Sequence, residues 1–398
     1  MIDWNEQFAA ATQNMRRNTV REFLKYAGRA GMISFGGGLP AAELFPMDEF
    51  QNASEAVLRK YGSRALQYGE TEGVPELREN VAQRHGVGIE NVLITSGAQQ
   101  ALDLLGRVLI DRGDVVAVEN PTYLALLSSW RVHEPEFTAV EPEDIGGDKG
   151  ALKRAELFYL VPNFQNPKGT TLTLETREKV AEFASTEEMA VIEDDPYGAL
   201  RYEREALPSI FELAGKCGGP VVSVGTFSKI LAPGLRVGWV IANKALIEKL
   251  VQAKQSADLH TSTLNQYLAC ELAMSGLLTT HVPKLCLEYG RRRAAMLAAL
   301  EEFMPGEVTW SRPAGGMFLL VRMPEVISGA EVAREALEEN VLVVPGDDFH
   351  IVGGRNTLRL NFSNCAPDSI RRGIQTLGKI VGRFLNEESK YRVSFSSV

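Results

Sequence analysis

Residues 157–198 read LFYLVPNFQNPKGTTLTLETREKVAEFASTEEMAVIEDDPYG, and this stretch decides the fold class. Two short and almost continuously apolar runs, LFYLV (157–161) and AVIE (190–193), enclose the amphipathic run LETREKVAEFAS (174–185). Apolar runs of this length predict strands covered on both faces, and the longer run between them predicts a helix. A strand, a helix and a second strand in succession indicate a parallel sheet, so the sequence predicts an α/β domain.

The same alternation extends to both sides of this stretch. The further predicted strands are VLIT (92–95), VVAV (115–118), VVSVG (221–225) and VGWVIA (237–242). The run AQQALDLLGRVL (98–109) predicts a helix, because Leu102, Leu105 and Leu109 fall on one of its faces. These elements extend the parallel sheet that residues 157–198 begin.

The order of predicted strands and helices changes in the last hundred residues. Predicted strands there are MFLLVRM (317–323), NVLVVP (340–345) and NTLRLNFS (356–363), with AEVAREALEEN (330–340) as a helix among them. We interpret this part as a smaller α+β unit. The first 45 residues, with a predicted helix TVREFLKYAGRA, are too few to fold alone and are assigned to the same unit. The expected domains are therefore 46–288, the large one, and 1–45 with 289–398, the small one.

The composition of the 398 residues excludes several classes of protein. With 42 Lys and Arg against 51 Asp and Glu, the net charge is −9, which disfavours binding to nucleic-acid backbones. The four cysteines form no CxxC pair and the five histidines no HExxH motif, which argues against a zinc or redox site. No apolar run approaches the ~18 residues of a membrane span, and the N-terminus lacks the apolar core of a signal peptide. We therefore expect a cytoplasmic protein that binds neither membranes nor nucleic acid.

Polar and aromatic side chains follow five of the predicted strands. The segments are Ser96–Gln99, Glu119–Tyr123, Pro162–Pro167, Asp194–Tyr197 and Thr226–Lys229, with Arg236 seven residues further on. Each segment alone has an ordinary explanation, such as a helix cap, a turn or a solvated lysine. In open α/β sheets, however, ligands bind beyond the carboxyl ends of the strands, so the five segments together predict one site.

The residue types of this site suit one kind of cofactor. A helix N-terminus, hydroxyl groups and an arginine can hold a dianionic phosphate. A lysine beside them can bind an aldehyde covalently, a carboxylate can keep a pyridine nitrogen protonated, and an aromatic ring can cover the pyridine face. These are the requirements of pyridoxal 5′-phosphate.

The same residues carry a family resemblance that extends from about Asn18 to the C-terminus. The chain resembles the fold-type-I, pyridoxal-phosphate-dependent aminotransferases of class I/II, and within them the 2-aminoadipate, kynurenine and multi-substrate subgroup. The segments that carry it are SFGGGLP (34–40), QYGETEG (67–73), SGAQQALDL (96–104), PNFQNPKG (162–169), EDDPYG (193–198), TFSKILAPGLRVGW (226–239), QAKQSADLH (252–260) and NTLRLNFS (356–363). The resemblance implies a large domain with a mainly parallel seven-stranded sheet between helices, together with a smaller α+β domain.

The resemblance also implies roles for the cofactor-binding residues. Lys229 would bind the cofactor covalently and move a proton between the substrate Cα and the cofactor C4′. Asp194 would hold the ring nitrogen. The other implied contacts are Tyr197 and Asn166 on the ring hydroxyl oxygen, Tyr123 on the ring face, and the N–H groups of Ala98 and Gln99 with Thr226, Ser228 and Arg236 on the phosphate. Tyr68 would reach the phosphate of a neighbouring subunit, which implies a homodimer with shared active sites.

The implied substrate contacts lie elsewhere in the sequence. Arg359 would bind the substrate α-carboxylate, with Asn166 beside it. Leu358 and Leu360 alternate with Arg359, which predicts that the arginine lies on an exposed face of its strand. Gly38 would lie where a side chain would obstruct the substrate. Arg21 would bind the distal carboxylate of 2-aminoadipate or glutamate; its alternative is a solvated charge on a helix.

The expected function is transamination by a two-step, ping-pong mechanism. The donors would be 2-aminoadipate, glutamate, leucine or aromatic amino acids, and the acceptor would be a 2-oxo acid such as 2-oxoglutarate. One alternative keeps the fold and the cofactor but catalyses C–S or β-elimination, which fold alone does not exclude. A regulator with an aminotransferase-like domain is a third reading, disfavoured because the sequence contains no basic DNA-reading helix.

Overall fold

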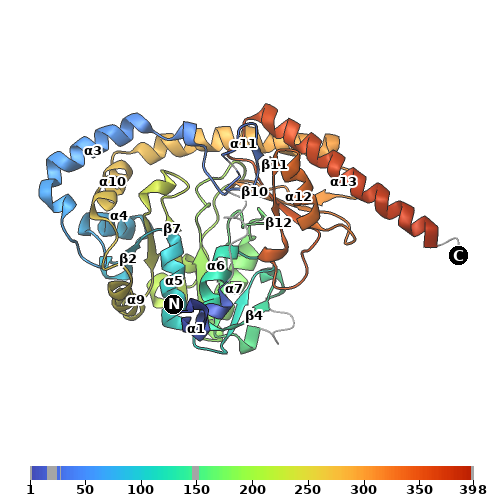
Figure 1. Ribbon diagram of the computed structural model, residues 1–398. Helices are drawn as coiled ribbons and strands as arrows, with labels where there is room; N and C mark the ends of the chain where they lie inside the picture. Colours follow the sequence, from blue (N-terminus) through green and yellow to red (C-terminus); the bar gives the residue numbers. More distant parts are fainter. Residues whose placement is uncertain (1, 16–24, 27, 146–151, 396–398) are drawn as a thin grey trace.

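A seven-stranded sheet forms the centre of the molecule (Figure 1). The computed structural model describes residues 2–15, 25–26, 28–145 and 152–395. The strand order is β2 (Val92–Thr95), β8 (Gly238–Ile241), β7 (Val221–Thr226), β6 (Ala190–Asp194), β5 (Leu157–Leu160), β3 (Val115–Val118) and β4 (Glu136–Ala139). β8 runs antiparallel to the other six strands of this sheet, which are parallel to one another. The predicted α/β class with a mainly parallel sheet is confirmed.

Helices cover both faces of this sheet because its strands are apolar on both sides. In β5, Leu157 and Tyr159 face one hydrophobic core, and Phe158 and Leu160 face the other. The first of these cores includes α5 (Ala98–Leu109), α6 (Leu124–Trp130) and α9 (Lys244–Ala257). The second includes α3 (Met47–Tyr61), α4 (Pro75–His85), α7 (Leu174–Thr186), α8 (Ile210–Leu213) and α10 (Thr263–Met274). The predicted strands and the helices at 98–109 and 174–185 are present, whereas β4 was not predicted because its four residues form a partly exposed edge strand with a weak apolar signal.

The C-terminal part builds two smaller sheets. One is antiparallel, in the order β12 (Val344–Pro345), β13 (Thr357–Asn361), β10 (Phe318–Arg322) and β9 (Thr309–Trp310). The other pairs β1 (Ile33–Ser34) with β11 (Val341–Leu342). A third core packs these sheets against α12 (Gly329–Glu338) and α13 (Pro367–Phe395). The single strand predicted at 340–345 is thus two strands, because the chain changes partners at the buried Val343.

The helix α11 (Leu277–Phe303) connects the large sheet with the C-terminal part (Figure 1). Its first turn packs in one core of the large sheet, Tyr289 packs in the other, and Met296 and Leu300 pack in the third core. The predicted domain boundaries at 46 and 289 stay a prediction.

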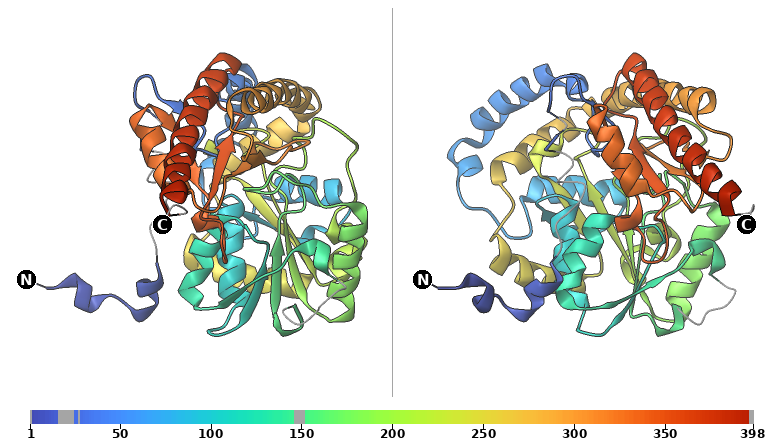
Figure 2. Two further views of the ribbon diagram at one scale, coloured as in Figure 1. Left: turned by 90° about the vertical axis from the view of Figure 1, so that its right-hand side faces the viewer. Right: turned by 45° about the vertical axis from the view of Figure 1, so that its right-hand side comes forward.

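The N-terminal residues 2–15 form α1 (Trp4–Gln7), which projects from the body of the molecule, and a 3₁₀ turn (Ala10–Asn14) (Figure 2). The turn contacts the large sheet's side of the molecule, where Asn14 Nδ2 donates to Glu134 Oε1 at 3.2 Å. Most of the helix predicted at 19–30 lies outside the described residues. Within the described part of the chain, no helix has the length and apolar character needed to cross a membrane.

Candidate active site

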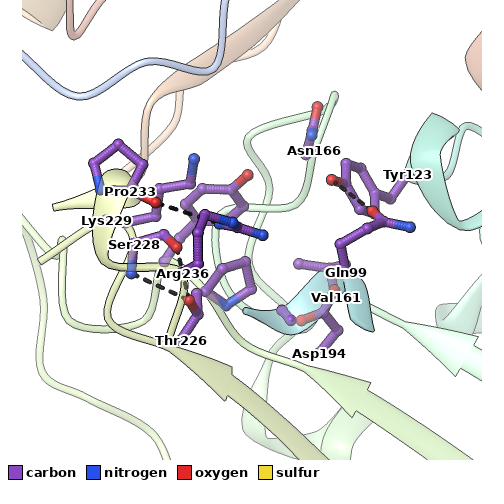
Figure 3. A pocket seen from close by; sticks show the side chains of 13 residues that line it. Gln99, Tyr123, Val161, Asn166, Asp194, Thr226, Ser228, Lys229, Pro233 and Arg236 are labelled. Atoms are coloured by element: carbon purple, nitrogen blue, oxygen red, sulfur yellow. Dashed lines mark hydrogen bonds between the residues drawn. The ribbon is translucent and has the colours of Figure 1, made fainter. Parts of the chain in front are cut away.

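One pocket lies beyond the carboxyl ends of the central strands (Figure 3). It collects ten of the predicted site residues: Ala98, Gln99, Tyr123, Asn166, Asp194, Tyr197, Thr226, Ser228, Lys229 and Arg236. Val161, Pro196 and Pro233 complete its wall. A second pocket shares several of these residues and adds Gly38 and Arg359. The five polar segments therefore meet at one edge of the sheet, as the topology predicts.

The N-terminus of α5 forms one end of this pocket. The helix begins after Gly97, whose φ is +81°, and no side chain caps it. Its first N–H groups are therefore free to bind an anion. A Cβ at position 97 would come within 2.6 Å of Arg236 Nη2, so both the backbone conformation and the close approach require glycine. Arg236 Nη2 in turn donates to the Ser96 carbonyl at 3.0 Å, which holds the guanidinium against the start of the helix.

Two hydroxyl groups lie beside this helix start. Thr226 Oγ1 lies 2.9 Å from Ser228 Oγ and 3.0 Å from the Val237 carbonyl oxygen, and it accepts a hydrogen bond from the Ser228 N–H at 3.1 Å (Figure 3). The Thr226 hydroxyl thus orients Ser228. Together the helix start, the hydroxyls and Arg236 provide N–H, O–H and guanidinium donors at the same end of the pocket.

The carboxylate of Asp194 lies at the end of β6 and is 3% exposed. Its Oδ2 accepts a hydrogen bond of 2.7 Å from the Tyr159 hydroxyl, whereas the buried Oδ1 has no hydrogen-bond partner. Burial raises the pKa of Asp194 to about 7, although the Tyr159 hydrogen bond opposes this rise. A buried acceptor without a donor is unfavourable, so the site fits a ligand that brings a donor to Asp194.

The amine of Lys229 lies between the two pockets. Its Nζ donates to the Gly38 carbonyl at 2.9 Å. Burial lowers the pKa of Lys229 to about 8, and the charges of Arg236 and Arg359 contribute to this lowering. Because an ordinary lysine has a pKa near ~10.4, this amine reaches its nucleophilic, neutral form much closer to neutral pH.

The guanidinium of Arg359 closes the other end. It stacks between two aromatic rings, with its Cζ 4.5 Å from the Phe318 centroid and 5.0 Å from the Phe349 centroid. It donates to Asn166 Oδ1 at 3.2 Å and to the Gly36 carbonyl, and its buried Nε has no partner. The prediction that Arg359 lies on an exposed face is wrong. Arg359 is 3% exposed because the second face of β13 packs toward the large sheet and lines the pocket, and this burial lowers its pKa to about 10.

Gly38 lines the second pocket together with Arg359. A Cβ at this position would come within 3.0 Å of the Phe318 ring. A side chain at position 38 would therefore meet the Phe318 ring, which also lines the second pocket, and its expected obstruction of the substrate stays a prediction.

Tyr68 is not among the residues that line these pockets. Tyr68 is 77% exposed and lies in a separate depression, with its ring 5.7 Å from that of His260. The position suits a residue that serves another subunit, and its role stays a prediction. Arg21 lies outside the described residues. Those residues also contain no group of three or more His, Cys, Asp or Glu side chains that could hold a metal ion.

Sequence reasoning missed the residues behind the pocket. Tyr159 is fully buried in β5, and its contact with Asp194 depends on the packing of neighbouring strands. A tyrosine inside an otherwise apolar strand is a usable signal, because a buried hydroxyl needs a partner. Asp195 is half-buried and accepts from Asn163 Nδ2, whose amide oxygen accepts from the fully buried Arg177. These groups fix the segment that carries Tyr197.

Comparisons with known proteins agree with this geometry. The family model described as aminotransferase class I and II matches residues 41–377. The 2-aminoadipate transaminase of Thermus thermophilus is 42% identical over 386 residues, which cover 95% of this chain and 97% of that protein. The aromatic-amino-acid aminotransferase 1 of Thermococcus litoralis is 40% identical over 398 residues, with coverage of 96% and 95%.

A solved structure shows the same similarity. The α-aminoadipate aminotransferase of Thermus thermophilus, complexed with N-(5′-phosphopyridoxyl)-L-leucine, superposes with a TM-score of 0.91 at 41% identity. The match covers 97% of this chain and all of that one. The fold and the pocket thus define a pyridoxal-phosphate-dependent enzyme of fold type I. The chain belongs to the class I and II aminotransferases, and pyridoxal 5′-phosphate is its cofactor.

Proposed function

We propose that this aminotransferase moves the amino group of 2-aminoadipate, glutamate, leucine or an aromatic amino acid to a 2-oxo acid such as 2-oxoglutarate, in two half-reactions. One observation carries the proposal. The amine of Lys229 has a pKa of about 8 and lies between two groups that can bind anions. One is the phosphate cup, formed by the start of α5, the hydroxyl groups beside it and Arg236, and the other is the buried guanidinium of Arg359. A single amine flanked by two anion-binding groups suits a cofactor phosphate on one side and a substrate carboxylate on the other.

The cofactor end of the pocket supports the first set of roles. When bound, pyridoxal 5′-phosphate supplies an aldehyde that amines attack and a ring that withdraws electrons from the amino acid. We assign Asp194 Oδ1 to the ring nitrogen, because this oxygen lacks a donor and Tyr159 fixes its partner oxygen. Tyr123 covers the ring face, and Asn166 and Tyr197 bind the ring hydroxyl oxygen.

The phosphate contacts follow from the groups at the start of α5. We assign the phosphate to the N–H groups of Ala98 and Gln99, the Ser228 hydroxyl and Arg236. Thr226 acts through Ser228, because its own hydroxyl is already bonded to the Val237 carbonyl. Dianion binding by N–H groups and a guanidinium is favoured by the helix dipole.

Lys229 is the group that moves the proton. Its neutral amine takes up the proton that leaves the donor Cα, which requires a base with a pKa near the working pH. The structure supports this role through the burial and the two neighbouring cations that lower its pKa. Arg359 binds the α-carboxylate and Gly38 leaves room beside it. This arrangement selects α-amino acids by a charge-assisted, bidentate contact.

The substrate end of the pocket supports donors with large side chains. Leu39, Leu124 and Phe349 give it apolar surface, and Ser128 and Ser129 add hydroxyl groups. This lining suits leucine and aromatic donors. For dicarboxylic donors we propose Arg21, on the resemblance alone. The relatives named above act, by their names, on 2-aminoadipate and on aromatic amino acids.

A homodimer is part of the proposal. Tyr68 and the neighbouring Leu66 are 77% and 68% exposed and line the same surface depression, so both are accessible to a second subunit. In a dimer, Tyr68 would reach the phosphate of the neighbouring subunit.

We also propose that the enzyme works in the cytoplasm. The supporting observation is that the four cysteines of the sequence form no CxxC pair.

The test is a single turnover with the donor alone. A transaminase releases one equivalent of 2-oxo acid per bound cofactor and then stops until an acceptor is added. Continuous release of ammonia and pyruvate, from a donor with a leaving group on Cβ, would instead show an eliminating lyase.

A panel of donors, tested on the wild type and on Arg21→Ala, separates the substrate classes. We expect dicarboxylic donors to lose far more activity than leucine, and an equal loss would remove Arg21 from the proposal.

A further inference from the structure

An ion pair between a buried lysine and a partly exposed aspartate connects the end of α9 to the start of α5, outside the residues that line both pockets. Lys254, in α9, is fully buried, and its Nζ donates to Asp258 Oδ1 at 2.6 Å. A buried lysine is expensive to desolvate, and burial lowers the pKa of Lys254 while its bond to Asp258 opposes this. Such a pair calls for an explanation beyond packing.

The second carboxylate oxygen of Asp258 binds two residues at the start of α5. Asp258 Oδ2 accepts from Ser96 Oγ at 3.0 Å and from Gln100 Nε2 at 2.6 Å. Gln100 Oε1 also accepts a hydrogen bond from the Ser96 N–H at 2.7 Å, so the three residues form one hydrogen-bonded ring. Burial alone would raise the pKa of Asp258, but the hydrogen bonds from Lys254, Gln100 and Ser96 bring it below its ordinary value, so the carboxylate is charged.

The residues held in this way flank the proposed phosphate contacts. Ser96 and Gln100 lie on either side of Gly97, Ala98 and Gln99. The Ser96 carbonyl also accepts from Arg236, so the same short segment orients the guanidinium. Because Gly97 has φ of +81° and no side chain, the segment has little stiffness of its own.

We propose that Lys254 and Asp258 are positioning residues that brace the phosphate cup; this inference rests on the phosphate site proposed above. Asp258 fixes the turn before α5, so that the helix N–H groups and Arg236 converge on one point. Lys254 neutralises Asp258, so that the brace adds no negative charge beside a dianion. Preorganised donors of this kind bind an anion more tightly than donors that must first be ordered.

The experiment compares two vitamers that differ only in the phosphate. The full-length chain, stripped of cofactor, is titrated with pyridoxal 5′-phosphate and with pyridoxal. The dissociation constant for pyridoxal divided by that for pyridoxal 5′-phosphate measures the contribution of the phosphate to binding. We expect Lys254→Met to reduce this ratio by about tenfold, the scale of one charge-assisted hydrogen bond, with little change in the affinity for pyridoxal.

The chain offers a matched control on the same helix. Lys244 pairs with Glu248 at 3.9 Å, also with i,i+4 spacing, but both side chains are exposed. Lys244→Met should leave the ratio unchanged within about twofold, as exposed pairs contribute little. The double variant Lys254→Met/Asp258→Asn removes both charges, so it stays testable if Lys254→Met alone does not fold.

The outcomes separate the two proposals. A Lys254→Met or double variant that folds and keeps the wild-type ratio overturns the brace. A wild type that binds both vitamers equally, or whose ratio does not change in Arg236→Gln, overturns the phosphate site itself. A fall in the affinity for both vitamers together would show a merely structural role for the pair and would also overturn the brace.

Discussion

The two ends of the pocket are built in different ways. The cofactor end consists of segments that each follow a strand of one sheet, and most of its residues lie between Ser96 and Arg236. The substrate end combines Gly38, near the N-terminus, with Phe318, Phe349 and Arg359 from the C-terminal part. The cofactor end therefore forms when the large sheet forms, whereas the substrate end forms only when the C-terminal part packs against that sheet.

Lys229 belongs to both ends, so its removal should have the largest effect. We expect Lys229→Ala to lower turnover by about 10⁴-fold or more, because both the covalent attachment and the proton transfer are lost. The cofactor should still bind through the phosphate cup, which absorbance after gel filtration would show. Turnover close to the wild type would remove Lys229 from the mechanism.

Asp194 tests the cofactor end alone. Asp194→Asn keeps the shape of the site but removes the charge that stabilises a protonated ring nitrogen, so kcat should fall by about 10²–10³-fold. The donor KM should change much less, since Asp194 does not line the second pocket. Steady-state kinetics on one donor measures both constants. A fall in kcat below about threefold would contradict the assignment.

A pair of arginine variants separates the two ends directly. Arg359→Gln removes the carboxylate contact, and we expect the donor KM to rise about 10–100-fold at nearly constant affinity for pyridoxal 5′-phosphate. Arg236→Gln should do the reverse, with weaker cofactor binding and a nearly unchanged donor KM in excess cofactor. If both variants changed both constants equally, the two ends would not be independent.

The pH dependence should give the smallest effect. Covalent capture of pyridoxal 5′-phosphate by the cofactor-free enzyme needs the neutral amine of Lys229, so its rate should rise with pH through the pKa of about 8 and then level off. Positive neighbours disfavour the protonated amine and lower this pKa. Removing the charge in Arg359→Gln should therefore raise the pKa and shift the profile to higher pH. Stopped-flow absorbance measures the shift, and a profile that moves to lower pH would contradict the electrostatic coupling.

Much of the fold and of the cofactor end could be predicted because the strands of the large sheet, apart from the partly exposed β4, have an apolar local composition. The helix at 98–109 and the strands at 92–95 and 115–118 have the predicted bounds. The strand predicted at 340–345 divides between two sheets, since pairing partners come from distant segments such as β1 and β13. Tyr159 was missed for the same reason, because its role depends on which strand lies beside its own.

The sequence by itself determined the α/β class, the family and the set of side chains that meet at one edge of the sheet, because parallel topology sends the carboxyl ends of the strands to the same side. Only the tertiary structure decided that Arg359 is buried between two aromatic rings, that Asp194 has one oxygen without a donor, and that Lys254 and Asp258 lie behind the start of α5. Burial and pairing across distant segments change the solvation and charge of a group, and local sequence does not encode them.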